Sequence, residues 1–177
     1  MATARVILRP RKARPFYGRH PWVLDTAVAH IDGSPADGDV VELIAENGKF
    51  VARGIFSSQS RIRVRLLTWN PTEAINDDFL RQRLQAALQL RRALGFDRPD
   101  GAARQVFSEA DGLTGLIVDR YGPYLAVQVN AHAMALRLPA LGRQCPKPCG
   151  PITASIGWQS ICWNRGEFWS RAVARAI

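Results

Sequence analysis

The hydrophobic period changes from two to 3.6 at Asn70-Pro71-Thr72, and this change most limits what the chain can fold into. Before it, arginines and apolar residues alternate along residues 61–68, which is the pattern of a strand with one buried face. After it, residues 76–95 carry a single apolar stripe at helical spacing. The sequence therefore predicts a β-rich unit at residues 1–70, followed by a second unit that begins with a helix.

The first unit is predicted to be all-β. Strand-like runs at residues 40–44 and 50–55 flank Glu46-Asn47-Gly48, which favours a tight hairpin because Asn-Gly readily adopts positive φ angles. A third strand follows at residues 61–68. Its apolar face would consist of Ile62, Val64 and Leu66, and its other face of Arg61, Arg63 and Arg65. Such an arginine face either discourages strand-to-strand aggregation or contacts RNA.

The helix at residues 76–95 has signals at both ends. Asn76 is a suitable N-cap, acidic residues occupy the first turn, arginines occupy the last, and Gly95 follows. Its apolar stripe is predicted to consist of Phe79, Leu80, Leu84, Ala87, Leu88 and Leu94.

A second α+β pattern follows the helix. Strands are predicted at residues 105–108, 113–118 and 124–129, and a helix at residues 131–141. Glu109 and Asp111 flank a glycine turn, so we interpret them as turn-forming acids rather than as a carboxylate pair for acid–base or metal chemistry.

The charge balance favours a polyanionic partner, nucleic acid first among them. The formal net charge is +9, and the pI is about 10.5. Six basic residues precede the first acid, Asp25: Arg5, Arg9, Arg11, Lys12, Arg14 and Arg19. This segment is either a solvated arm or a phosphate-contacting one, and the neighbouring β-rich unit favours phosphate.

Targeting signals are not evident. No stretch approaches the roughly 18 apolar residues that span a bilayer, and the first residues lack the apolar run of a secretory signal. The arginine-rich start resembles a transit peptide in composition, but Val6-Ile7-Leu8 followed by Pro10 is more typical of a short strand. Three cysteines, an odd number, argue against a disulfide framework. We expect a cytoplasmic protein without membrane partners.

Two separated stretches carry a family resemblance. The first is Gly18-Arg19-His20-Pro21-Trp22-Val23, followed by Gly38-Asp39-Val40-Val41, Gly54-Ile55-Phe56 and Ile62-Arg63-Val64-Arg65. The second is Glu109-Ala110-Asp111-Gly112-Leu113-Thr114-Gly115-Leu116, continuing to Tyr121, in which Thr114 stands where the family usually has proline. Together they resemble the class I large-subunit ribosomal RNA methyltransferase family, over residues 4 to 140.

The resemblance implies a mixed α+β protein: a PUA-like pseudo-barrel at 1–70, then part of the family's small central α+β domain at 71–141. The family methylates carbon 5 of a cytosine in large-subunit ribosomal RNA with S-adenosylmethionine. It implies structured RNA, large-subunit ribosomal RNA above all, as the partner, and a homodimer. The family's central domain has two strands, a helix and two further strands, of which the last two find no match here.

Residues 142–177 differ in composition from the rest. They hold Cys145, Cys149 and Cys162, three of the five tryptophans and a single acid, and they show no clear helical or strand period. We expect this segment to be poorly ordered. It is either the product of a shifted reading frame after about Leu141 or a genuine, divergent tail. A zinc site on the cysteines is a third interpretation, disfavoured because two prolines separate Cys145 from Cys149 and the tail has no histidine.

The catalytic and cofactor-binding domain finds no match, because no Gly-rich strand-to-helix turn occurs. We therefore assign no catalytic, cofactor-binding or metal-binding residue, and expect the chain to be inactive alone. RNA binding remains as its function; a free-standing PUA-type or ribosome-associated RNA-binding protein is the alternative. Trp22 could stack on a base, but Trp before Val-Leu is more typical of a core, and Trp69 is also assigned to packing. The candidate phosphate contacts are Lys12, Arg14, Arg19, His20, Arg63 and Arg65.

Overall fold

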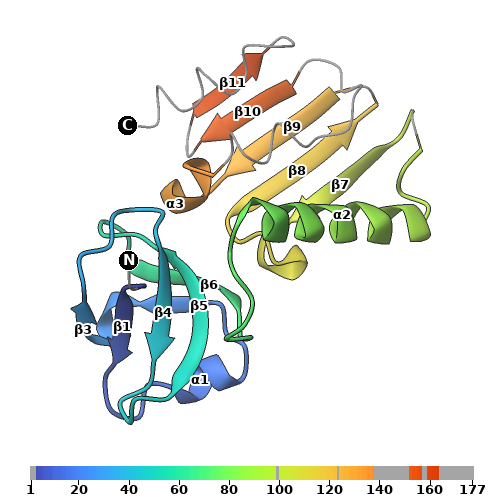
Figure 1. The fold of residues 1–177 in the computed structure, drawn as a ribbon. Coiled ribbons are helices and arrows are strands. Elements are labelled where there is room, and N and C mark those ends of the chain that lie inside the picture. The colour runs from blue at the N-terminus through green and yellow to red at the C-terminus, as the bar shows by residue number, and fades with distance from the viewer. Residues whose placement is uncertain (1–2, 99, 123, 138–151, 157–158, 164–177) are drawn as a thin grey trace. The chain divides into compact units, whose positions relative to one another are not determined.

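The computed structural model describes residues 3–98, 100–122, 124–137, 152–156 and 159–163 (Figure 1). The chain divides into two compact units, with the boundary between Asn76 and Asp77. Both consist mainly of strands with few helices, which confirms the predicted mixed α+β class. Among the described residues, no helix has the length and apolar character needed to cross a membrane.

The first unit is a curled six-stranded sheet with the order β2-β6-β5-β4-β1-β3 (Figure 1). Only β1 and β4 pair in parallel. The sheet can curl into a half-barrel because its two outer strands are consecutive in the chain, joined by the short helix η1. Its elements are β1 (Arg5–Leu8), α1 (Arg14–Tyr17), β2 (Trp22–Leu24), η1 (Asp25–Ala27), β3 (Val28–Asp32), β4 (Val40–Ile44), β5 (Phe50–Phe56) and β6 (Ile62–Thr68).

The predicted hairpin connects β4 and β5. Gly48 has a φ of 79°, and its N–H donates to the carbonyl of Ala45 at 2.9 Å. The N–H of Ala45 in turn donates to the carbonyl of Lys49 at 2.9 Å. The turn therefore forms because glycine supplies the left-handed backbone that the hairpin requires.

The core of the first unit is filled by the alternating inward residues of its strands. Trp69 packs against this core, and its indole Nε1 donates to the carbonyl of Phe16 at 2.7 Å. The packing role predicted for Trp69 is confirmed, and the same contact fastens buried Phe16, and with it α1, to the sheet. The largest fully buried side chains on these strands are those of Val6, Leu8, Val23, Val41, Leu43, Ile55 and Val64.

The second unit is a five-stranded sheet with the order β11-β10-β9-β8-β7, and α2 packs against β7 (Figure 1). Strands β9 and β10 pair in parallel, and the other pairs are antiparallel. Its elements are α2 (Asp77–Ala93), β7 (Ala102–Phe107), η2 (Ser108–Asp111), β8 (Leu116–Tyr121), β9 (Tyr124–Val129), α3 (His132–Ala135), β10 (Ile152–Ile156) and β11 (Gln159–Trp163).

Helix α2 confirms the predicted helix, with one change in its buried face. Gly95 has a φ of 74°; the N–H of Gly95 donates to Arg92 O and that of Phe96 to Arg91 O, which is the Schellman ending expected of a glycine here. Leu94, predicted to lie in the apolar stripe, is 58% exposed. Arg91 is buried at the corresponding turn instead.

Arg91 is buried because it forms an ion pair with Asp111. Its Nη1 and Nη2 lie 2.6 and 2.7 Å from the two carboxylate oxygens, and its Nε donates to the carbonyl of Arg104 at 3.1 Å. The same carboxylate accepts the N–H of Phe107 at 2.5 Å. Asp111 ends η2 ahead of Gly112, so it is a turn residue as predicted. It also connects α2 to the β7–β8 turn.

Glu109 has a comparable role in the same turn. Its carboxylate accepts hydrogen bonds from the hydroxyls of Ser108 and of Thr114, the latter at 2.7 Å. Thr114 is fully buried, and the N–H of Gly115 donates to the Ser108 hydroxyl at 2.8 Å. At Thr114 the chain thus buries a hydroxyl that the neighbouring carboxylate satisfies.

The predictions for the last third of the chain need two corrections. Residues 131–141 were expected to be helical, whereas α3 comprises only residues 132–135, and residues 138–141 lie outside the described part. Residues 142–177 were expected to lack regular structure and the last two central strands to be missing. Strands β10 and β11 occupy part of this segment, β10 being paired with β9. The side chains of Cys145, Cys149 and Cys162 lie outside the description.

Candidate nucleic-acid interface

Four of the candidate phosphate-contacting residues that the sequence nominates lie in or next to helix α1. Lys12, Arg14, Arg19 and His20 precede, begin or follow it, and all four are exposed. Within the described part of the chain, the side chains of Lys12, Arg14 and Arg19 have no hydrogen-bond or ion-pair partner. These cations are therefore available to a ligand outside the chain.

The backbone around α1 is held in an unusual conformation. Arg11 and Arg19, one on each side of the helix, both have a φ of 63°, which residues with a side chain adopt only where the surrounding structure requires it. The N–H of Arg19 donates to Phe16 O, and that of His20 to Pro15 O. On the other side, the N–H of Arg11 donates to the Glu46 carboxylate at 2.5 Å. The cations thus stand on a fixed loop.

Trp22 lies at the sheet edge, beside His20 and Arg65, and not in the core. It is 40% exposed, so the interpretation of Trp22 as a core residue is wrong. Strand β2 is an edge strand of three residues in which only Val23 points inward. Alternation along the strand therefore turns Trp22 and Leu24 outward.

The Trp22 ring contacts His20 and Arg65. The guanidinium carbon of Arg65, its register partner on β6, lies 5.8 Å from the ring centroid. The His20 ring lies 6.2 Å away at an interplanar angle of 88°, and His20 Nδ1 accepts the N–H of Trp22 at 3.2 Å. His20, Trp22 and Arg65 therefore form one cluster across β2 and β6.

Arg63 differs from the other nominated residues. It is half-buried, and its Nη1 donates to the carbonyls of Ser57 and Ser58 in the β5–β6 connection. The predicted three-arginine face is thus divided: Arg61 is exposed, Arg63 binds the chain's own backbone and Arg65 packs on Trp22. The structure brings Arg65 together with His20 but directs Arg63 to its own loop. From here on, "the α1 surface" denotes residues 12–20 with Trp22 and Arg65.

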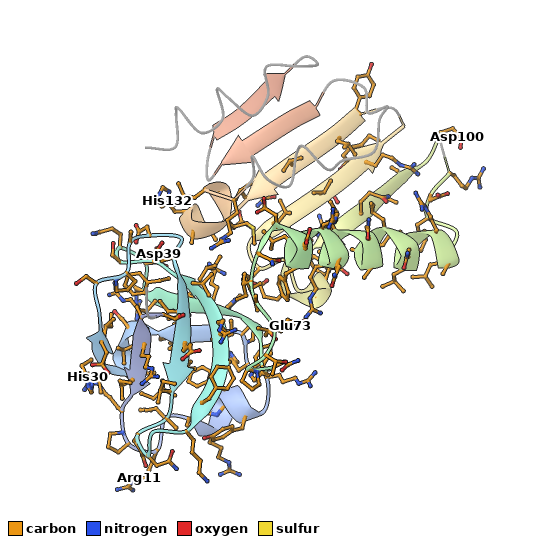
Figure 2. All side chains as sticks on the ribbon, viewed as in Figure 1. Arg11, His30, Asp39, Glu73, Asp100 and His132 are labelled. Atoms are coloured by element: carbon orange, nitrogen blue, oxygen red, sulfur yellow. The ribbon has the colours of Figure 1, made fainter. Side chains whose placement is uncertain are left out.

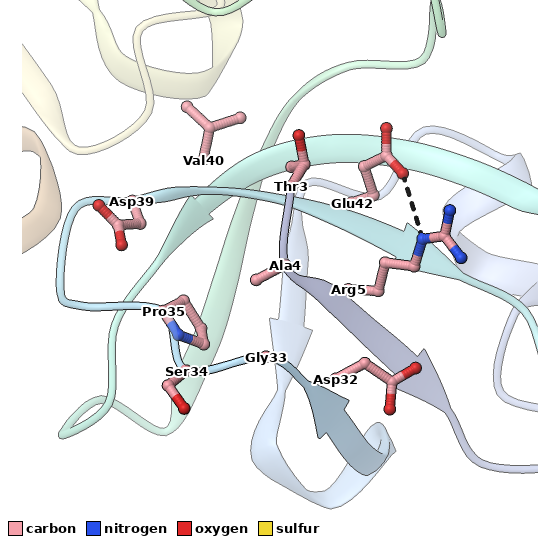
Figure 3. A pocket seen from close by; sticks show the side chains of 10 residues that line it. All are labelled: Thr3, Ala4, Arg5, Asp32, Gly33, Ser34, Pro35, Asp39, Val40 and Glu42. Atoms are coloured by element: carbon pink, nitrogen blue, oxygen red, sulfur yellow. Dashed lines mark ion pairs between the residues drawn. The ribbon is translucent and has the colours of Figure 1, made fainter. Parts of the chain in front are cut away.

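The first unit also carries an acidic hollow that the sequence did not indicate (Figure 3). It has a volume of about 960 Å³ and includes Arg5 and the carboxylates of Asp32, Asp39 and Glu42. Glu42 lies 3.8 Å from Arg5 and 2.7 Å from Arg53. The three acids are scattered over β3, the following loop and β4, so no local pattern points to them.

The hollow and the α1 segment give the first unit two unlike ends. Arg11, just before α1, and Asp39, at the hollow, lie at opposite ends of this unit in Figure 2. The cations at the first end would attract a polyanion, whereas at the second end Asp32 and Asp39 would not, and Glu42 is paired with Arg5 and Arg53. In the part of the chain that the structure describes, no cluster of three or more His, Cys, Asp or Glu side chains could hold a metal ion.

Arginines of the second unit are engaged within the fold. Arg104 forms a two-point ion pair with Asp119, its register partner, at 2.8 and 3.0 Å. This hydrogen bonding raises the pKa of Arg104 above its ordinary value, so the guanidinium stays charged. Arg120 donates to the carbonyls of Phe96 and Arg98. Together with the Arg91–Asp111 pair, these contacts use the cations to hold the second unit together.

The first unit is similar to a known domain family. Residues 6–69 match the family model of a PUA-like domain. Ribosomal RNA large subunit methyltransferase I of Alteromonas mediterranea is 38% identical over 127 residues, which are 72% of this chain and 32% of that protein. The enzyme of the same name from Cronobacter sakazakii is 36% identical over 141 residues, 78% of this chain and 35% of that protein. The chain is homologous to large-subunit ribosomal RNA methyltransferases. It spans about a third of the length of these relatives.

Solved structures extend the likeness beyond the PUA-like domain. A structure described as a SAM-dependent methyltransferase from Streptococcus mutans covers 92% of this chain with a TM-score of 0.72 and 14% identity. A methyltransferase complexed with SAH covers 94% with a TM-score of 0.68 and 17% identity. This chain covers 43% of each of those chains. At such identities the likeness concerns the fold, which includes both the PUA-like domain and the second unit.

Proposed function

We propose that the PUA-like domain binds structured large-subunit ribosomal RNA through the α1 surface, as the RNA-recognising part of a ribosomal RNA cytosine-C5 methyltransferase. The observation that carries this proposal is the set of three exposed, unpartnered cations, Lys12, Arg14 and Arg19, on a fixed loop. Arg65 extends the positive surface onto the sheet edge, and His20 lies between it and the α1 segment against the Trp22 ring. Arg63 can contact phosphate only if RNA displaces the hydrogen bonds that its guanidinium donates to the carbonyls of Ser57 and Ser58.

The names of the homologous enzymes support ribosomal RNA as the ligand. Cations on a rigid segment suit the phosphate backbone of folded RNA, because phosphate contacts position a module without reading base sequence. The hollow at the other end of the unit offers no comparable set of unpartnered cations, since its Arg5 is paired with Glu42. We place this activity in the cytoplasm, where large-subunit RNA is modified. We also propose that the full-length protein forms a homodimer.

Methyl transfer from S-adenosylmethionine is part of this proposal only for a full-length enzyme. The described residues do not fit that cofactor. In the sheet of the second unit, β9 and β10 pair in parallel, and the chain leaves β9 through Asn130 and Ala131 into α3. This strand-to-helix turn contains no glycine, and α3 has only four residues, whereas the cofactor-binding turn is rich in glycine and leads into a long helix. We therefore assign no catalytic or cofactor-binding residue to the described part of this chain.

The proposal predicts RNA binding that depends strongly on salt and on three side chains. In the variant K12Q/R14Q/R19Q, the slope of log Kd against log salt should fall in magnitude by about two to three, because each lost phosphate contact removes about one released counterion. The Kd for a folded large-subunit RNA fragment should rise about 10- to 100-fold near 0.1 M salt. Fluorescence anisotropy of the labelled RNA, titrated with the full chain at several salt concentrations, measures both.

The matched control is R81Q/R92Q/R98Q, which also removes three exposed positive charges but from the second unit. Its salt slope should change by less than one. Equal losses in the two triple variants would show that net charge alone governs binding and would contradict the assignment of the surface. A wild-type chain without affinity for folded ribosomal RNA even at low salt would overturn the proposed function.

A further inference from the structure

Trp22 is a large aromatic side chain at a sheet edge, in contact with Arg65 and His20 and with 40% of its surface exposed. We infer that Trp22 is a stacking platform for one unpaired nucleobase of the bound RNA. The inference rests on the proposed function and deepens it, since it names the RNA feature that the α1 surface selects: a bulged or looped-out nucleotide beside a helical segment.

The Trp22 ring is held in place before any ligand arrives. Its neighbour Val23 is fully buried and anchors β2 to the core. Arg65 lies over the ring at 5.8 Å, and the His20 ring stands edge-on at 88°. The backbone N–H of Trp22 is bonded to His20 Nδ1. A ring fixed from two strands and one loop loses little conformational entropy when a second planar group stacks on it.

The surroundings of the ring favour a nucleobase over an apolar ligand. A base carries its own phosphates, and the exposed cations Arg14 and Arg19 lie on the adjoining segment that ends at His20. An apolar ligand would remove water from these cations without pairing their charge, whereas the phosphates of a nucleotide would pair with them. Stacking on an aromatic side chain tolerates any base identity, because every base has a π face.

Base pairing decides which RNAs can use the platform. In a continuous A-form duplex the faces of the bases are buried in the stack, so none can lie against Trp22. A nucleotide outside the stack can. The α1 cations would therefore bind any folded RNA through its phosphates, and Trp22 would add affinity only where an unpaired base is present.

The test compares two RNA hairpins of the same stem sequence, one fully paired and one with a single-nucleotide bulge. The full chain, Trp22→Leu and Trp22→Phe are titrated with both, and far-UV circular dichroism checks that each variant is folded. Trp22→Leu should weaken binding of the bulged hairpin about 10-fold and of the paired hairpin less than about 2-fold. Trp22→Phe should keep most of the difference between the two RNAs.

Two controls separate stacking from general effects. Leu24→Ala changes another outward residue of β2 that is 43% exposed, and it should leave both affinities unchanged. A 2-aminopurine placed at the bulge should lose fluorescence on binding the wild-type chain and keep it on binding Trp22→Leu. K12Q/R14Q/R19Q should lose affinity for both hairpins alike.

The outcomes distinguish this inference from the proposed function. If the wild-type chain binds both hairpins equally, or if Trp22→Leu weakens both equally, the stacking platform is wrong while RNA binding through the α1 surface stands. If the wild-type chain binds neither hairpin at low salt, the proposed function fails and the inference fails with it. The stacking platform is supported if Trp22→Leu loses affinity for the bulged hairpin alone, and if 2-aminopurine is quenched by the wild-type chain but not by Trp22→Leu.

Discussion

Replacing Gly54 with alanine is expected to destabilise the PUA-like domain by about 3 kcal/mol or more, at or above the upper end for overpacked sites. A Cβ at Gly54 would lie 2.2 Å from Arg65 O, 2.8 Å from Arg65 C and 2.9 Å from Leu66 Cα. These are backbone atoms of the paired strand β6, so no side-chain rotation can relieve the overlap. Strands β5 and β6 would have to separate at the centre of the sheet.

Urea unfolding of the full chain followed by circular dichroism measures this loss, and hydrogen exchange at β5 and β6 amides locates it. Gly48→Ala is the matched control in the same unit. Its φ of 79° makes alanine unfavourable, but a Cβ there would meet no atom within 4 Å. We expect it to cost about 1 kcal/mol. A Gly54→Ala variant as stable as Gly48→Ala would mean that β5 and β6 do not approach each other as closely as the structure shows.

The Asp111→Ala variant should lose about 3–5 kcal/mol of stability in the second unit, because it leaves a buried charge without its partner. The side chains of Arg91 and Asp111 are only 11% and 6% exposed. The variant also removes the acceptor of the Phe107 N–H. Hydrogen exchange should therefore accelerate in α2 and at the β7–β8 turn, while the PUA-like domain keeps its protection.

The double variant R91M/D111N tests the cause. It removes the buried charge, keeps an oxygen that can accept from Phe107, and fills the arginine's place with an apolar chain, so it should be more stable than Asp111→Ala alone. The exposed pair Arg92–Asp97 is the control, since both side chains are more than half exposed. Arg92→Ala should change stability by less than about 0.5 kcal/mol. A double variant no better than Asp111→Ala would show that the hydrogen bonds, and not the charge, hold the turn.

Local rules account for the elements that the sequence predicted well. The Asn-Gly hairpin, the alternation of β6 and the ends of α2 each depend on residues that are near one another in the chain. Leu94 and Arg91 show where such rules fail. Spacing alone puts an apolar residue in the buried stripe, but a carboxylate 20 positions away in the sequence makes the arginine the buried one.

Edge position and sheet context explain the other differences. Trp22 precedes two apolar residues and therefore suggests a core, yet β2 is so short and so near the sheet edge that only Val23 reaches inward. Strands β10 and β11 have five residues each, too few to establish a period amid prolines, cysteines and tryptophans. Their pairing with β9 and with each other is a property of the sheet. The acidic hollow likewise depends on three acids brought together only by folding.

The strand order of the PUA-like domain also determines how much of it must be synthesised before its sheet can close. Its first strand, β1, lies between β3 and β4, and β2 pairs only with β6, the last strand of the domain to be made. A nascent chain that stops short of β6 has no partner for β2 and cannot close the curled sheet. Such long-range pairing makes folding slow compared with that of a helix. The arginine-rich first segment is therefore synthesised well before β6 and before Trp69, whose indole Nε1 donates to the carbonyl of Phe16 in α1.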